Sequence, residues 1–294
     1  MRVPGGRGNF LRPTGQLGAS LRVKSRWLVP LLLLILPLGL AGQLAPPPAS
    51  RPGPPAEIEP LAQDFPEALV PSLGKQIYEQ DQRVNTATEM ARARGIDFAK
   101  EQVRGWIVVR DRAAERVRFM REENGGVVNA FEVAFVAGAV PQFQRLGGER
   151  LTEAEEGQFR ARLRAISGIV QQCSALYGFA ILDHPQIDAF LIYAVAKPTE
   201  PGSVVVGGHY RFVVSRDGQR GISAERLYRN CLTLPANASA GKQTEGVAIT
   251  NLASERPLET HVYLSLLHRL PLFVATADGT RWTVDGLRVD PVRP

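Results

Sequence analysis

Residues 189–196 read AFLIYAVA, a run of eight apolar or aromatic side chains without a polar interruption. A strand with one face in water alternates apolar and polar residues, whereas a strand buried on both faces has such a continuous run. The run therefore predicts a central strand of a sheet. After it, residues 204–216 and 247–251 are predicted strands, with a short helix near residues 224–232 between them.

The C-terminal end of the chain is also predicted to form strands. Residues 260–267, 271–276 and 281–284 are short apolar segments that contain β-branched and aromatic side chains, and such side chains favour a pleated sheet. Asp278 and Gly279 are typical turn residues between the last two segments. These three strands are expected to close the domain.

Short segments rich in Val and Phe precede the central run and are separated by polar turns. Residues 106–111, 116–123 and 129–137 are therefore predicted to form an antiparallel meander. Alternate side chains of this meander would form one buried face: Val117, Phe119, Phe131, Val133 and Phe135. A helix over residues 73–94, ended by Gly95, is predicted before the meander.

A second helix should begin at Thr152, because Thr152 and Glu155 have the spacing of a capping box. Its apolar stripe would consist of residues three and four apart: Phe159, Leu163, Ile166, Val170, Cys173 and Leu176. Together the elements indicate an α+β fold, an antiparallel sheet or sheets with packed helices. The folded domain is expected to span residues 67–294, with a subdivision near residues 150–180 left open.

An uncharged apolar run, WLVPLLLLILPLGLAG, occupies residues 27–42. Residues 1–26 carry basic side chains and no acid, so they are expected to stay in the cytoplasm while the rest is exported. The 16 residues of the run suit either the core of a cleaved signal peptide or a single transmembrane anchor. Both alternatives stay open, and both place the domain in the periplasm or outside the cell.

The segment between the apolar run and the domain, residues 43–66, holds eight prolines and is predicted to be an extended linker. The net charge of +6 resides in residues 1–45, which hold six basic residues and no acidic one. The remainder is neutral, so no nucleic-acid partner is expected. The expected partners are the membrane, through residues 27–42 if they are not cleaved, and an envelope protein or polymer.

Three stretches resemble a family of exported proteobacterial proteins with no known activity: GGHYRFVVSRDG at residues 207–218, Cys231-Leu232, and ETHVYLSL at residues 259–266. The resemblance covers roughly Gly105 onward. It implies an exported bacterial protein, and it implies no mechanism.

Cys173 and Cys231 are the only two cysteines of the sequence. Cys173 falls on the predicted apolar helix stripe, and Cys231 lies four residues after Leu227 in the predicted short helix, so both would point toward a core. In an oxidising compartment, two such cysteines are expected to form a structural disulfide.

Four polar residues are candidates for a catalytic site: His209, His261, Glu259 and Asp217. On predicted strands, Glu259 and His261 would share one face of the sheet. The histidines lack the spacings of common metal motifs, so no metal and no cofactor is expected. Gly207 and Gly208 precede a predicted strand, which favours a β-bulge over a phosphate-binding loop.

Two functions are compatible with these patterns. The first is a non-catalytic, membrane-proximal binding protein of the bacterial envelope, and it is preferred because serine-hydrolase, nucleotide-binding and CxxC motifs are missing from the sequence. The alternative is an envelope hydrolase with a His-centred polar or metal site. It requires His209 and His261 to converge in a polar pocket. A purely structural subunit would instead show a large exposed apolar patch.

Overall fold

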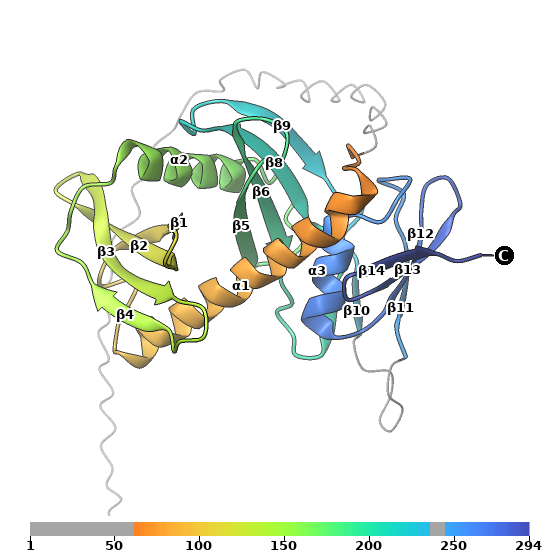
Figure 1. Cartoon of the computed structure of the whole chain (residues 1–294), viewed down its shortest axis with the longest axis horizontal. Helices are drawn as coiled ribbons and strands as arrows, with labels where there is room; N and C mark the ends of the chain where they lie inside the picture. The colour runs from red at the N-terminus through yellow and green to blue at the C-terminus, as the bar shows by residue number, and fades with distance from the viewer. Residues whose placement is uncertain (1–61, 236–244, 294) are drawn as a thin grey trace, which may run out of the picture. The chain divides into compact units, whose positions relative to one another are not determined.

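The computed structural model describes residues 62–235 and 245–293 (Figure 1). The predictions for the basic region (residues 1–26), for the apolar run (residues 27–42) and for residues 43–61 of the linker lie outside these ranges. Within them, no helix is both long and apolar enough to cross a bilayer. The described residues all belong to one compact unit, Glu57–Pro294.

The described part of the chain is a mixed α+β fold. Its helices are the 3-10 turn η1 (Glu67–Leu69) and the α-helices α1 (Val70–Ala93), α2 (Glu153–Ser167) and α3 (Glu259–His268). Its strands are β1 (Val103–Arg110), β2 (Glu115–Glu123), β3 (Gly126–Phe135), β4 (Gln142–Arg145), β5 (Tyr177–Asp183), β6 (Ala189–Ala196), β7 (Ser203–Val205), β8 (Tyr210–Ser215), β9 (Gly221–Arg226), β10 (Thr233–Pro235), β11 (Val247–Thr250), β12 (Leu272–Ala275), β13 (Arg281–Asp285) and β14 (Arg288–Pro291).

Strand β6 is the central strand that the sequence predicts. It pairs antiparallel with β5 and β8 in a sheet of order β5-β6-β8-β9, and all of its side chains are buried. Its two faces belong to different cores. One core lies toward α3 and the C-terminal sheet and the other toward the N-terminal meander: Leu191, Tyr193 and Val195 join the first, and Phe190, Ile192 and Ala194 join the second.

The predicted N-terminal meander is confirmed, and β4 extends it by one further antiparallel strand. Its predicted inner face is buried, except that Phe135 is only half-buried. Phe119 and Phe131 stack across neighbouring strands with ring centroids 4.7 Å apart. Such cross-strand aromatic pairs stabilise a sheet and help to set its register.

The C-terminal sheet has the order β11-β12-β13-β14. Its last three strands form an antiparallel meander, with Asp278 and Gly279 in the turn between β12 and β13 as predicted. Strands β11 and β12 instead run parallel, so the antiparallel prediction is wrong for this pair. Parallel neighbours need a crossover connection, and α3 provides it.

The strand predicted over residues 260–267 is wrong, because this segment is helix α3. All of the first seven residues of α3 are buried. The segment therefore has neither the alternation of a half-exposed strand nor a one-sided helical stripe. Periodicity alone does not distinguish a strand from a helix in such a run. Close contact with α1 accounts for the burial: a Cβ at Gly74 would lie 2.5 Å from the Cβ of Val262.

Two further predictions for the C-terminal half are corrected. The strand predicted over residues 204–216 is split into β7 and β8, and β7 pairs with β10 in a separate two-stranded sheet. Residues 224–232 do not form the predicted helix, because residues 221–226 form β9 and pair with β8. Strand β9 is an edge strand with exposed or half-buried side chains, so it lacks the apolar pattern that would have indicated a strand.

Helix α2 starts at the predicted capping box, in which the N–H of Thr152 donates to Glu155 Oε2 at 2.8 Å. The predicted apolar stripe is confirmed for Phe159, which is buried, and is wrong beyond it: Leu163 and Ile166 are 43% and 39% exposed, respectively. The helix ends at Ser167, and the rest of the stripe lies in the following loop: Val170, Cys173 and Leu176. Small residues and one phenylalanine form the buried face instead: Gly157, Phe159, Ala161 and Ala165.

Candidate functional site

His209 lies between β7 and β8 and is buried. Its Nδ1 accepts the backbone N–H of Ala196 at 3.0 Å, and its Nε2 lies 3.0 Å from the carbonyl oxygen of Val205. These contacts assign the ring proton to Nε2, which donates to Val205. Burial lowers the pKa of His209 to about 4, although the hydrogen bond to Val205 acts in the opposite direction. The ring is therefore neutral at neutral pH.

His261 lies in the first turn of α3, and its Nδ1 accepts the backbone N–H of the N-cap residue Leu258 at 2.9 Å. A Glu or Gln at this position would make the same contact in a capping box. Burial, together with the proximity of His209, lowers the pKa of His261 to about 3. The structure thus brings the two histidines near each other, as the hydrolase hypothesis requires, but both rings are buried and hold backbone groups.

Glu259, the first residue of α3, is buried and is held by Arg211 of β8. Arg211 Nη1 donates to Glu259 Oε1 at 2.9 Å, and Arg211 Nε donates to Glu225 Oε2 at 2.6 Å. Burial alone would lower the pKa of Arg211. The net effect is a raised pKa, because the interactions with Glu259, Tyr193 and Glu225 are stronger than the effect of burial. Burial raises the pKa of Glu259, and Arg211 opposes that effect. The result is a buried ion-pair network that joins β8, β9 and α3.

The segment that precedes η1 closes over this network. Arg211 Nη2 donates to the carbonyl oxygen of Gln63, and the guanidinium carbon of Arg211 lies 4.9 Å from the ring centroid of Phe65. The N–H of Gln63 donates to Glu225 Oε1 at 2.9 Å. Arg211 and Glu225 therefore hold the segment that precedes η1, and Glu259 is occupied by its ion pair with Arg211.

Asp217 lies in the exposed turn between β8 and β9, at the opposite end of β8 from His209. Its carboxylate accepts from Ser215 Oγ at 2.5 Å and from the N–H of Gln219 at 2.9 Å. These two hydrogen bonds lower the pKa of Asp217. Asp217 thus shapes a turn, and the structure does not bring it to the two buried histidines.

Cys173 and Cys231 form a disulfide between the loop after α2 and the segment between β9 and β10. Neither cysteine lies in a helix, so the pairing does not arise from the predicted helix faces. The neighbouring glycines allow close packing here. A Cβ at Gly208 would lie 2.7 Å from Cys173 Sγ, and a Cβ at Gly207 would lie 2.0 Å from the carbonyl oxygen of Asn230. The N–H groups of Val206 and Gly207 both donate to the carbonyl oxygen of Leu232, so two residues oppose one next to the β7–β10 pair, as the predicted β-bulge requires.

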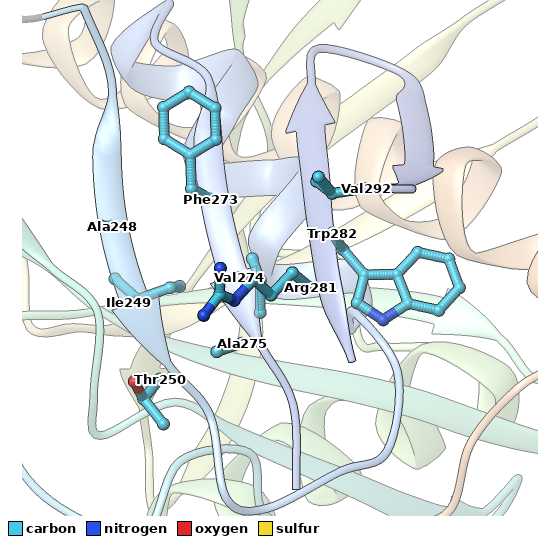
Figure 2. Close-up of a pocket in the computed structure, with 9 residues that line it drawn as sticks. All are labelled: Ala248, Ile249, Thr250, Phe273, Val274, Ala275, Arg281, Trp282 and Val292. Carbon is cyan, nitrogen blue, oxygen red and sulfur yellow. The ribbon is translucent and has the colours of Figure 1, made fainter. Parts of the chain in front are cut away.

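The outer face of the C-terminal sheet carries a hollow of about 390 Å³ (Figure 2). It is lined by Ala248, Ile249, Thr250, Phe273, Val274, Ala275, Arg281, Trp282 and Val292. Phe273 is 45% exposed, and Arg281 is the one charged residue of the lining. Sequence reasoning missed this hollow. The alternation of Val247 and Ile249 with the smaller Ala248 could have indicated that one face of β11 is open.

Within residues 62–235 and 245–293, no three His, Cys, Asp or Glu side chains gather in a group that could hold a metal ion. Comparison of the chain with protein-family models, with curated proteins and with solved structures found no match.

Proposed function

We propose that the chain is an exported, membrane-proximal binding protein of the bacterial envelope and that it has no catalytic role. The observation that carries this proposal is the structural use of the candidate catalytic groups. His209 and His261 each accept a backbone N–H through Nδ1, and Glu259 is paired with a buried arginine. A general base must be within reach of its substrate and titrate near the working pH. The two histidines meet neither requirement, because burial keeps a substrate from reaching the rings and their lowered pKa values lie far from neutral pH.

The disulfide supports the exported location. Cys173 and Cys231 are bonded in the structure, and such bonds form and persist in oxidising compartments such as the periplasm. Export would be driven by residues 27–42, either as a cleaved signal or as an anchor. The resemblance of residues 207–218 and 259–266 to exported proteobacterial proteins points to the same location.

Export can be tested with the oxidation state of the two cysteines in living cells. Thiols of the full chain and of a variant without residues 1–42 would be trapped with a maleimide and counted by mass spectrometry. We expect a disulfide in the full chain and free thiols in the shortened chain, which stays in the reducing cytoplasm. Free thiols in the full chain would contradict an exported location.

The non-catalytic assignment is tested by comparing the wild-type chain with His261→Gln. Glutamine accepts an N–H at the same helix position, so this variant should fold while it removes the imidazole. Both proteins, and a His184→Gln control, would be assayed with chromogenic esters, phosphate esters, glycosides and casein. We expect no turnover above background. Turnover that His261→Gln abolishes and His184→Gln retains would establish the hydrolase alternative.

A further inference from the structure

We propose that the open edge of β11 and the hollow beside it bind an extended segment of a partner protein that carries an acidic side chain. This inference rests on the proposed binding function, and it names the site and the chemistry of the partner. Three features of the C-terminal sheet carry it: the direction of the backbone groups of β11, the shape of the hollow and the charge of Arg281.

The backbone of β11 faces β12 at alternate residues. The N–H of Val247 donates to the carbonyl oxygen of Pro271 at 3.0 Å, and the N–H of Asn251 donates to that of Ala275 at 2.8 Å. Successive residues of a strand direct their backbone groups to opposite edges. The N–H and the carbonyl of Ala248 therefore point away from β12.

The outward edge of β11 is open over Ala248 and the N–H of Thr250. In the described part of the chain, the group bonded to this edge is the hydroxyl of Tyr228, which donates to the carbonyl oxygen of Thr250 at 2.6 Å. No described residue is bonded to the outward groups of Ala248. An edge strand with unpaired backbone groups is a template for another strand, which is the mode of binding called β-augmentation.

The hollow lies on one face of the C-terminal sheet, beside β11. Every second side chain of such an added strand would point to this face. Ala248, Thr250 and Ala275 are small, and they form its floor between the larger side chains of Phe273 and Arg281 (Figure 2). A Cβ at Gly246 would lie 2.6 Å from Phe273 Cε2, so the phenylalanine ring lies against the backbone just before β11. An apolar side chain of the added strand would contact this ring.

Arg281 gives the hollow its charge. The register places Arg281 of β13 beside Ala275 of β12, which in turn lies beside Thr250 of β11. The guanidinium extends across Ala275 toward β11 (Figure 2), and within the described ranges it forms no ion pair. A guanidinium offers paired donors that fit a carboxylate. Charge complementarity therefore selects an acidic side chain.

Two other occupants fit this charge less well. A second copy of the chain would present another Arg281 at the same face and no carboxylate from the hollow. Residues 236–244 of the same chain, ANASAGKQT, contain a lysine and no acidic residue. A heterologous acidic segment is the occupant that matches both the backbone edge and the arginine.

The test is selection of peptides from a phage-displayed library of random heptapeptides on the exported wild-type chain. We expect enrichment of sequences that combine Val, Ile or Thr with one Asp or Glu. A synthetic copy of the best peptide would then be titrated against variants. Ala248→Pro removes an outward N–H that an edge strand does not need, so the fold should be kept while affinity falls about tenfold or more.

Charge reversal gives the second variant and its matched control. Arg281→Glu should weaken the acidic peptide at least ~10-fold and should select Lys- or Arg-containing peptides in a repeated selection. Arg288→Glu makes the same change on β14, at the opposite edge of the same sheet, and should leave affinity unchanged. A conserved thermal unfolding midpoint would show that each variant is folded.

Several results would overturn the proposal. One is selection of no peptide, and another is binding that Ala248→Pro and Arg281→Glu leave intact. Dimerisation that Ala248→Pro abolishes would assign the edge to a second copy. Tighter peptide binding after replacement of residues 236–244 by a Gly-Ser loop would assign it to that segment. Failure here is distinguishable from failure of the proposed function, because the turnover and thiol assays test catalysis and export without using this site.

Discussion

His209 and His261 lie on different parts of the chain, yet each uses Nδ1 to accept a backbone N–H. The acceptor role requires a neutral ring, and burial keeps the ring neutral by lowering the pKa of both. The sequence indicated that these residues could converge, but it could not indicate their burial. The reason is that the sequence predicts a strand on which Glu259 and His261 share one face, whereas both residues lie in the buried first turn of α3.

The neutral histidines predict that acid destabilises the fold. Their folded-state pKa values, about 4 and 3, lie below the ordinary 6.5. The unfolded chain therefore binds more protons as pH falls below about 6.5, and the free energy of unfolding decreases toward pH 4. Between about pH 6.5 and pH 4.5, each histidine should lower the free energy of unfolding by roughly 2–3 kcal/mol.

Urea unfolding of the wild-type chain and of His261→Gln at several pH values checks this expectation. The raised pKa of Glu259 acts in the opposite direction in both proteins, so the difference between them isolates His261. On acidification, the free energy of unfolding of the variant should fall by about 2 kcal/mol less than that of the wild-type chain. An identical pH dependence would show that His261 is not buried in its neutral form.

At the scale of elements, the secondary-structure predictions were correct for two kinds of segment: strands with one face exposed to water, and strands with both faces buried in a core. The N-terminal meander and β6 belong to these two classes. The predictions failed for α3, which is buried on nearly every side, and for β9, which is buried on almost none. In both, tertiary contacts decide the structure, and no periodic pattern records them. The hollow on the C-terminal sheet was missed for the same reason, since its lining comes mostly from strands β11, β12 and β13, which are distant in the sequence or follow a turn.

Helix α2 supplies a matched pair of substitutions. Ala161 is buried and Leu163 is 43% exposed, although the sequence pattern places Leu163 on the core face. Ala161→Leu should lower the free energy of unfolding by about 1–3 kcal/mol, because it overpacks a filled interior. Leu163→Ala should change it by less than about 1 kcal/mol. Denaturant titration of both variants measures the difference, and the reverse order would mean that α2 presents its other face to the sheet.

At the scale of the whole molecule, helix α1 contributes to both cores that meet at β6. Ile77 belongs to the core shared with α3, and Ala87 belongs to the core shared with the meander. Between them, Gln80 Nε2 donates to the carbonyl of Ile181 at 3.1 Å, and Gln80 Oε1 accepts the N–H of Ile181. The side chain thus covers the outer edge of β5. The edge of β11 has no such cover over Ala248 in the described residues.

The disulfide is expected to stabilise the whole domain. Cys173 and Cys231 are separated by 58 residues, and the chain-entropy account gives about 4 kcal/mol for a loop of this length. Urea unfolding of Cys173→Ser/Cys231→Ser should therefore have a lower midpoint than that of the wild-type chain. A reductant should shift the wild-type midpoint toward that of the variant and leave the variant unchanged. Coincident midpoints for both proteins without reductant would contradict a stabilising role.

The central claim is that the β11 edge binds an acidic extended segment of an envelope protein. The most direct measurement places a photo-crosslinking amino acid at position 273 of the full chain in intact cells and identifies the attached peptide by mass spectrometry. Position 287 is the control, because Phe273 and Leu287 are both 45% exposed. We predict an adduct at position 273 alone, with a partner segment that contains Asp or Glu among β-forming residues. Equal labelling from both positions, or attachment only within the same chain, would contradict the account.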